Sequence, residues 1–257
     1  MLKKVLCLSS LLFVFPLCAL SHEGIVTNDS YSRSRRLLLN EVYKDNKKTL
    51  YCNIPFDENN NLIIPEWFDV SKVADRSHRI EIEHVIPAEK FGLYIKQWWK
   101  GDPLCMDKNG EPFKGRRCAE KTSRIFRLMQ ADMYNLYPSV GSLNAIRAQY
   151  DFGEFPKFFP SLYKGCQIKL ADGKIEIPDT AKGTVARTYL YFQEQYPFFK
   201  LSAKELQLFQ KWNQTYQVTP WECLRTYRIE QIQFNENTFV KSQCVQKNLW
   251  PTKKEEK

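Results

Sequence analysis

The pattern of apolar and polar positions predicts a mostly helical chain with one short buried strand near its middle. The strand covers residues 79–86 (RIEIEHVI), where β-branched side chains alternate with charged ones. Glu83 and His84 lie inside this run. Burying a carboxylate and an imidazole is unfavourable unless each finds a partner. This strand is therefore the first place to look for chemistry.

Apolar residues at spacings of three and four predict helices on both sides of the strand. Before it we expect a helix over residues 30–46 and a short strand over residues 49–54. After it, helices are expected over residues 88–100 and 125–136, and Pro138 should end the second one. Residues 139–150 predict one more short helix.

The last third of the chain predicts three helices, over residues 179–195, 203–216 and 220–233. Two of them begin with the spacing of a capping box: Ser202 with Glu205, and Thr219 with Glu222. No internal repeat occurs, and no apolar segment after the N-terminus is long enough to span a bilayer. The expected fold class is α+β, in a single domain over residues 22–257 with a frayed tail at 253–257.

The N-terminus predicts a secretory signal peptide at residues 1–21. Two lysines precede an uncharged apolar run, and small residues follow it at positions 19 and 21, which is the order of a cleaved export signal. A lipoprotein site at Cys18 is disfavoured, because Leu17 stands where a small residue is needed. We therefore expect a periplasmic or secreted protein.

Removal of that segment takes two of the eight cysteines with it and leaves six. An even number of cysteines in an exported chain predicts three disulfides. Short loop closure favours the pairs Cys105 with Cys118 and Cys223 with Cys244. Cys52 and Cys166 then remain as the third pair. A zinc site is disfavoured, because no close pair such as C-x-x-C occurs.

The mature chain is basic, with 36 basic and 29 acidic side chains, a formal charge of +7 compared with +9 before cleavage. A basic, exported, disulfide-bonded protein suits an anionic polymer, whether nucleic acid, anionic lipid or cell-wall polymer. A basic surface that serves only solubility is the alternative, so charge alone does not identify the partner.

The residues around His84 exclude several classes of hydrolase. His78 and His84 would lie about 20 Å apart on a strand, too far to share one metal ion. The zinc-protease motifs H-E-x-x-H and H-x-x-E-H are absent, and so is the esterase motif G-x-S-x-G. One imidazole, one carboxylate, side-chain amides and arginines suit phosphodiester hydrolysis with a hard cation such as Mg²⁺. In that scheme His84 takes a proton from water, with Glu83 and Asn144 as oxygen ligands.

Strand geometry sets a test for this scheme. In a regular pleat Glu83 and His84 point to opposite faces, so both can reach one site only if the strand bends or ends there. Pro87 favours a strand end nearby, because it cannot donate to a sheet ladder. If the strand stays regular and no site joins His84 to Asn144, the scheme fails.

Several motifs follow one another along the chain: EHVIPA at residues 83–88, KGRRC at 114–118, and DMYNLYPSVG at 132–141 followed by Asn144 and Arg147. Together they resemble the endonuclease I family of bacterial periplasmic or secreted nucleases. VARTY at 185–189 and WEC at 221–223 extend the resemblance, which runs from about residue 30 to 245. It implies a small antiparallel sheet and a ββα-metal finger, in which a strand delivers the histidine and a helix delivers the asparagine.

The resemblance also implies roles for individual residues. His84 would be the general base, Glu83 and Asn144 would bind one Mg²⁺ ion, and Arg116 or Arg117 would contact the scissile phosphate. Mn²⁺ or Ca²⁺ can replace Mg²⁺ in such a site. Family members cleave DNA, and often RNA, through backbone contacts with little sequence preference, and leave 5′-phosphate ends. We expect a monomer without stable membrane association.

The chain departs from the family pattern in three places. Gln130 stands where many relatives carry glutamate, Tyr134 replaces a common histidine, and AI at 145–146 replaces a Gly-Asp pair. Gln130 argues against a second carboxylate beside the metal. The adjacent arginines at 116 and 117 leave the phosphate contact ambiguous.

Two other functions stay open. One is a non-catalytic exported nucleic-acid-binding protein that serves DNA uptake. The other is a cell-wall glycosidase with Glu81 and Glu83 as its carboxylate pair, since residues two apart on a strand are separated by about 6.6 Å. The glycosidase hypothesis leaves His84 without a role.

Overall fold

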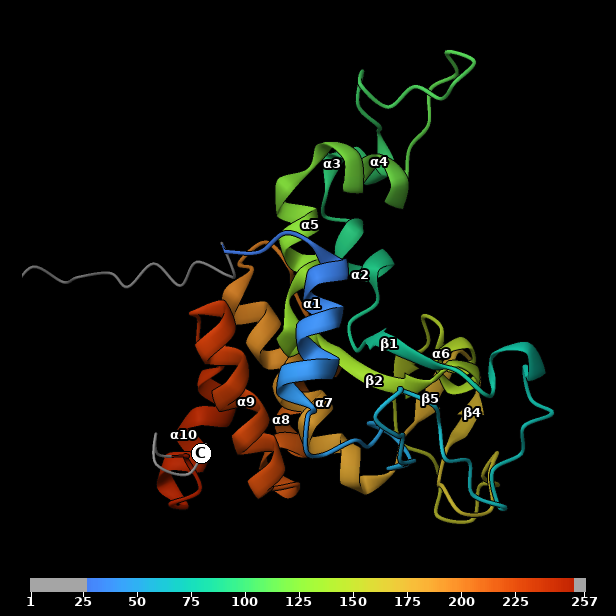
Figure 1. Ribbon diagram of the computed structural model, residues 1–257, viewed down its shortest axis with the longest axis vertical. Coiled ribbons are helices and arrows are strands. Elements are labelled where there is room, and N and C mark those ends of the chain that lie inside the picture. The colour runs from blue at the N-terminus through green and yellow to red at the C-terminus, as the bar shows by residue number, and fades with distance from the viewer. Residues whose placement is uncertain (1–26, 252–257) are drawn as a thin grey trace, which may run out of the picture.

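The computed structural model describes residues 27–251, so the expected signal peptide at 1–21 and tail at 253–257 lie outside the described residues. Helices dominate, and the strands are short, which confirms the α+β class. In Figure 1, helices α7 to α10 lie together on one side, while β1, β2 and α6 lie on the other. Helices α3 and α4 project at the top with the long loop that joins them.

The bounds of the elements are as follows. The helices are α1 (Tyr31–Leu37), α2 (Ala88–Gly92), α3 (Lys96–Trp99), α4 (Arg116–Thr122), α5 (Arg124–Ala131), α6 (Gly141–Arg147), α7 (Asp179–Gln195), α8 (Ala203–Thr215), α9 (Pro220–Gln233) and α10 (Thr238–Gln246). The strands are β1 (Ile80–His84), β2 (Leu136–Val140), β3 (Asp151–Phe152), β4 (Lys169–Ala171) and β5 (Lys174–Glu176).

Strands β1 and β2 form an antiparallel pair, and α6 follows β2 without a linker. This is the expected small sheet with its strand–strand–helix order. Strand β2 itself was not predicted from periodicity, because Pro138 was expected to end a helix there. Pro138 instead lies opposite Ile82 within the pair. A two-stranded sheet tolerates proline, since each strand has one edge that needs no donor.

Two further predictions before and after β1 are wrong. Residues 49–54 form turns and no strand: Asn53 has a left-handed φ of 50°, and the Ile54 amide bonds back to the Thr49 hydroxyl. The helix expected over residues 88–100 is broken into α2 and α3. Trp98 folds back over Gly92, and its ring occupies the space that a β-carbon at position 92 would need. A continuous helix would not allow this contact.

The helix expected over residues 30–46 is shorter and changes type. Helix α1 ends at Leu37, and a π-helical turn (Leu38–Val42) completes it. Helix α5 also ends early, at Ala131, because Asp132 adopts an extended backbone and caps the following turn, Met133–Asn135. The Asp132 carboxylate is buried and accepts hydrogen bonds from two tyrosines of the last third of the chain.

The C-terminal helices agree closely with the sequence. Helices α7 and α9 have the expected bounds, α8 is one residue shorter, and α10 was not expected. The capping box of Ser202 and Glu205 is present at α8. At α9 only half of the motif forms, because the Glu222 carboxylate binds Arg187 of α7 instead, at 2.6 and 2.7 Å.

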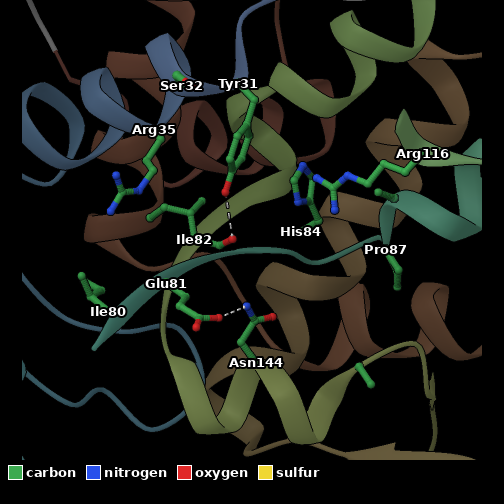
Figure 2. A pocket seen from close by; sticks show the side chains of 12 residues that line it. Tyr31, Ser32, Arg35, Ile80, Glu81, Ile82, His84, Pro87, Arg116 and Asn144 are labelled. Atoms are coloured by element: carbon green, nitrogen blue, oxygen red, sulfur yellow. Dashed lines mark hydrogen bonds between the residues drawn. The ribbon is translucent and has the colours of Figure 1, made fainter. Parts of the chain in front are cut away.

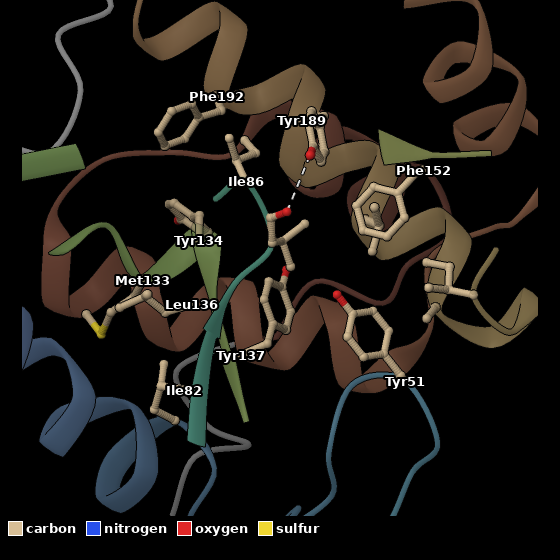
Figure 3. Packing of buried hydrophobic residues seen from close by; sticks show 14 of the residues in the cluster. Tyr51, Ile82, Ile86, Met133, Tyr134, Leu136, Tyr137, Phe152, Tyr189 and Phe192 are labelled. Atoms are coloured by element: carbon tan, nitrogen blue, oxygen red, sulfur yellow. Dashed lines mark hydrogen bonds between the residues drawn. The ribbon is translucent and has the colours of Figure 1, made fainter. Parts of the chain in front are cut away.

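The core lies between the β1–β2 pair and α7 (Figure 3). Ile86 lies near Tyr189 and Phe192 of α7, Leu136 lies beside Met133, and all these side chains are buried. The Tyr189 hydroxyl lies 3.4 Å from the Val85 carbonyl oxygen and can donate to it. These contacts fix the end of β1, which carries His84.

The three expected disulfides are all present: Cys52 to Cys166, Cys105 to Cys118, and Cys223 to Cys244. The last pair forms a small separate cluster with Val218 and Val240. Within residues 27–251, no helix is both long enough and apolar enough to cross a bilayer.

Candidate active site

A pocket of about 610 Å³ lies along β1 between α1, α4 and α6 (Figure 2). Its polar lining comes from four segments of the chain. Tyr31 and Arg35 belong to α1, His84 and Glu81 to β1, Arg116 to α4 and Asn144 to α6. Residues more than a hundred positions apart therefore meet at one strand.

His84 ends β1 with its imidazole half-buried. Its Nε2 atom lies 2.9 Å from the carbonyl oxygen of Gln130. A carbonyl oxygen can only accept a hydrogen bond, so Nε2 carries the proton and Nδ1 keeps a free lone pair. The ring of Tyr31 stacks on the imidazole, with centroids 5.3 Å apart. Both contacts fix the orientation of the imidazole, and the hydrogen bond to Gln130 also fixes its tautomer.

The surroundings keep His84 neutral. Burial lowers the pKa of His84 from 6.5 to about 4, the charge of Arg116 acts in the same direction, and the hydrogen bond to Gln130 opposes it. The imidazole is therefore in its basic form at neutral pH. A group in this state can accept a proton.

Glu81 and Asn144 form the second polar group of the pocket. The Asn144 amide nitrogen donates to Glu81 Oε2 at 2.7 Å, and Arg76 grips the same carboxylate through two nitrogens. Burial alone would raise the pKa of Glu81, but the hydrogen bonds from Arg76 and Asn144 lower it below its usual value. Glu81 is therefore an ionised carboxylate.

Glu83 lies apart from this group. Its side chain is buried, accepts a hydrogen bond from the Tyr51 hydroxyl, and lies 3.3 Å from Arg147 Nε. Burial raises the pKa of Glu83 to about 7, although the charge of Arg147 and the bond from Tyr51 lower it. The structure does not bring Glu83 and Asn144 together.

Strand geometry explains which carboxylate meets Asn144. Strand β1 stays regular through His84, so Glu81 and Glu83 project toward α6 while His84 projects toward α1. Asn144 and Arg147 are one helical turn apart, and each meets one of the two glutamates. The proposed scheme required the strand to bend or end here, and β1 does end at His84, but Glu83 still faces away from the pocket. Instead, the pocket extends along β1 and is lined by residues of both faces.

The contact between Glu81 and Asn144 was not predicted, because Glu81 was considered only as a glycosidase carboxylate. The sequence spacing did allow this contact. Two carboxylates that are two residues apart on a strand, Glu81 and Glu83, share one face, and so do two residues that are three apart on a helix, Asn144 and Arg147. What the spacing could not supply was the position of α6 along β1, which follows from the β1–β2 register.

The two adjacent arginines differ in position. Arg116 lines the pocket, and its Nε donates to Glu120 at 2.9 Å. Arg117 packs over the ring of Phe113 at 4.0 Å from the ring centroid and is not part of the pocket lining. The geometry therefore favours Arg116 as the group that meets a phosphate.

Gln130 forms hydrogen bonds both to His84 and to Glu120, the partner of Arg116. Its carbonyl oxygen binds His84, and its side-chain amide donates to Glu120 at 2.7 Å, the same carboxylate that holds Arg116. A glutamate at position 130 would place two carboxylates within hydrogen-bond distance and repel Glu120. The departure of this chain from the family pattern thus fits its own surroundings.

The pocket offers hard oxygen ligands for a cation. The described residues contain no group of three or more His, Cys, Asp or Glu side chains that could hold a metal ion. Glu81 supplies a carboxylate, and the neighbouring Asn144 supplies an amide, whose nitrogen is the atom that faces Glu81 in this structure. Mg²⁺ suits such a sparse set, since it keeps several waters and needs only one or two protein carboxylates.

Comparison with known proteins supplies the family. A model of the family described as Endonuclease I matches residues 31–244. This chain belongs to the endonuclease I family. The resemblance inferred from the motifs is thereby confirmed, and the match includes every residue of the pocket.

Relatives of this endonuclease I family member have names that agree with one another. An extracellular deoxyribonuclease of Aeromonas hydrophila is 33% identical over 219 residues, 82% of this chain and 89% of the relative. A periplasmic deoxyribonuclease of the same organism is 33% identical over 79% of this chain and 82% of the relative. Endonuclease-1 of Buchnera aphidicola subsp. Baizongia pistaciae is 32% identical over 92% of this chain and 94% of the relative.

Proposed function

We propose that the protein hydrolyses phosphodiester bonds of DNA as an exported endonuclease, either periplasmic or secreted. The observation that carries the proposal is a neutral His84 with a free Nδ1, in one pocket with Arg116 and the Glu81–Asn144 pair. The named activity of the relatives supports the substrate. We extend the proposal to RNA, because the charged groups of the pocket suit the phosphate backbone that both nucleic acids share. We also propose that the enzyme is a monomer.

In the proposed reaction His84 is the general base. Its Nδ1 atom takes the proton from the attacking water, while Nε2–H stays bound to the Gln130 carbonyl. That carbonyl also stabilises the positive charge that the ring acquires. Arg116 is half exposed and free to turn from Glu120 toward a phosphate oxygen. Water attacks phosphorus while the bond to the leaving 3′ oxygen breaks, and that oxygen takes a proton from solvent water, so the products would carry 5′-phosphate and 3′-hydroxyl ends.

We assign the cation site to Glu81 and Asn144. A bound Mg²⁺ would supply positive charge against the phosphate as its charge grows during the reaction. Arg76 holds the Glu81 carboxylate in place, so the ligand is already oriented before any ion arrives. Glu83 is assigned a structural position instead, because its carboxylate is buried against Tyr51 and Arg147.

The experiment compares two histidine variants on supercoiled plasmid DNA with Mg²⁺, Mn²⁺ or EDTA. We expect cleavage with the cations and none with EDTA. His84→Ala should lose cleavage and keep DNA binding, because it removes the base and leaves the charges. His78→Ala is the matched control, since His78 is exposed and outside the pocket. Intact plasmid with the parent protein would overturn the proposal.

The same assay separates the two other functions. A non-catalytic binder would shift the mobility of DNA without nicking it under any cation. The structure disfavours the glycosidase hypothesis, because Glu83 is buried against Tyr51 and Arg147 and does not line the pocket with Glu81. Release of sugar from peptidoglycan would be needed to restore it.

A further inference from the structure

An arm projects from the body beside the pocket, formed by α3, α4 and the loop between them (Figure 1). The loop is held closed by the disulfide between Cys105 and Cys118 and by the Phe113 amide, which donates to the Cys105 carbonyl at 2.8 Å. The Gly115 amide donates to the Trp98 carbonyl at 2.8 Å and ties the loop to α3. The arm is thus a defined structure, although it adds little to the core.

The arm exposes large apolar side chains. Leu104 is 69% exposed, Trp99 is 56% exposed and Met106 is 46% exposed. Exposure of apolar side chains to water is unfavourable, and three of them on one projecting segment fit a binding surface, although Phe158 and Phe234 elsewhere are more exposed. None of these residues lines the pocket that contains His84.

A second pocket of about 620 Å³ is hollowed into this arm. Met106, Pro112 and Phe113 give it an apolar floor. The charged side chains of its lining are one acid, Asp102, and three lysines: Lys96, Lys100 and Lys114. We call this hollow the arm pocket.

The chemistry of the arm pocket fits a nucleotide. A base needs an apolar or aromatic surface for its flat face, and the adjoining phosphates need cations. Protein sites for single-stranded nucleic acid combine the same two features, an aromatic surface and a positively charged groove. Phe113 provides the aromatic ring, one face of which Arg117 covers at 4.0 Å from the centroid, and the three lysines provide the positive charge.

The arm pocket also lies close to the active site along the chain. Lys114 lines the arm pocket, and Arg116 lines the pocket of His84. Only Gly115 separates them, so the two linings are about 7 Å apart along the chain. A strand whose phosphate lies at Arg116 can therefore place a neighbouring nucleotide at Lys114.

We propose that the arm pocket is a second substrate site, which takes an unpaired nucleotide of the strand that is being cut. This inference rests on the proposed nuclease function and adds a preference to it. A paired base is stacked within the duplex and cannot enter, so the site favours single strands and frayed ends. The lysines can bind the phosphates of any DNA, whereas the ring of Phe113 can stack only on an unpaired base.

The test measures kcat and KM on one labelled oligonucleotide, once as a single strand and once as a duplex. Phe113→Leu keeps an apolar side chain and removes the aromatic face. It should raise KM for the single strand by about tenfold and leave KM for the duplex unchanged, since only an unpaired base can stack on the ring. The value of kcat should stay the same on both.

A charge variant tests the rim of the arm pocket. Lys96→Glu with Lys100→Glu should raise KM for both substrates and flatten the salt dependence of binding. Lys204→Glu with Lys247→Glu is the matched control, because it changes the net charge equally at exposed positions outside the arm. The control should keep the parent KM.

The outcomes separate this inference from the proposed function. If the parent protein cleaves neither substrate, the nuclease proposal fails. If the parent cleaves and the arm variants match it in KM on single strands, the arm pocket has no such role. Loss of binding to phosphatidylglycerol vesicles in the arm variants, with unchanged KM on oligonucleotides, would assign the arm to a membrane and overturn the inference.

Discussion

Replacing Glu83 by glutamine should change how the stability of the protein depends on pH. Glu83 is 1% exposed and lies against Arg147 and Tyr51. Burial raises its pKa from 4.5 to about 7 in the folded state. The folded protein therefore binds this proton more tightly than the unfolded chain does, and the sign of the effect follows from that difference.

The stability that the raised pKa of Glu83 contributes is fully present below pH 4.5 and is lost as the pH rises through about 7. A tenfold difference in proton affinity is equivalent to about 1.4 kcal/mol, so the free energy of unfolding should fall by roughly 2–3 kcal/mol between about pH 5 and about pH 8. Glutamine has nearly the same shape and does not titrate. The Glu83→Gln variant should therefore lose this part of the pH dependence.

The assay is urea unfolding of both proteins at several pH values, followed by tryptophan fluorescence with the disulfides intact. The quantity of interest is the difference between the two proteins, because burial also raises the pKa of Asp132 and that group titrates in both. Parallel stability curves for parent and variant would refute the reasoning. They would mean that Glu83 keeps an ordinary pKa in the folded state.

The same variant also separates the two carboxylates of β1. Glu83→Gln should keep Mg²⁺-dependent cleavage of plasmid DNA, whereas Glu81→Gln should weaken it, because Glu81 is the partner of Asn144. Cation titrations should show a higher requirement for Mg²⁺ in the Glu81 variant only. The opposite result would place Glu83 at the cation and remove Glu81 from it.

Three further predictions concern the pocket and the core. In a plot of kcat/KM against pH, activity should fall on the acid side only well below pH 6.5, because His84 of the free enzyme loses its basic form only near pH 4. A fall centred near pH 6.5 would show that His84 has the pKa of an ordinary histidine. Arg116→Ala should lower kcat/KM by about 100-fold and Arg117→Ala should leave it near the parent value, since only Arg116 lines the pocket; equal losses in the two variants would contradict this assignment. Arg187→Met should lower the free energy of unfolding by about 3–5 kcal/mol in a denaturant titration, because Glu222 would remain buried without its partner; a loss below about 1 kcal/mol would contradict the reasoning.

Local patterns in the sequence were sufficient for several parts of this protein. The C-terminal helices follow from apolar periodicity and from the caps at Ser202 and Thr219, which act within one helical turn. The disulfide pairs followed from counting and short loop closure. The motifs around His84 indicated the family, because they combine rare residue types in a fixed order.

Features that depend on more distant contacts were not available from the sequence. Strand β2 was missed because its pairing with β1 outweighs the local effect of Pro138. Helix α5 was predicted too long, because the tyrosines that hold Asp132 lie 59 and 64 residues further along the chain. In both cases a tertiary contact outweighed the local preference.

By itself, the sequence determined that His84 stands on a buried strand, that the chain is basic, and that Asn144 lies on a short helix after the motif at residues 132–141. Only the tertiary structure decided which groups meet. The β1–β2 register places α6 so that Asn144 reaches Glu81 while Arg147 reaches Glu83. The physical reason is that alternation along a strand fixes which face a side chain takes, whereas the partner on that face is set by packing across the chain.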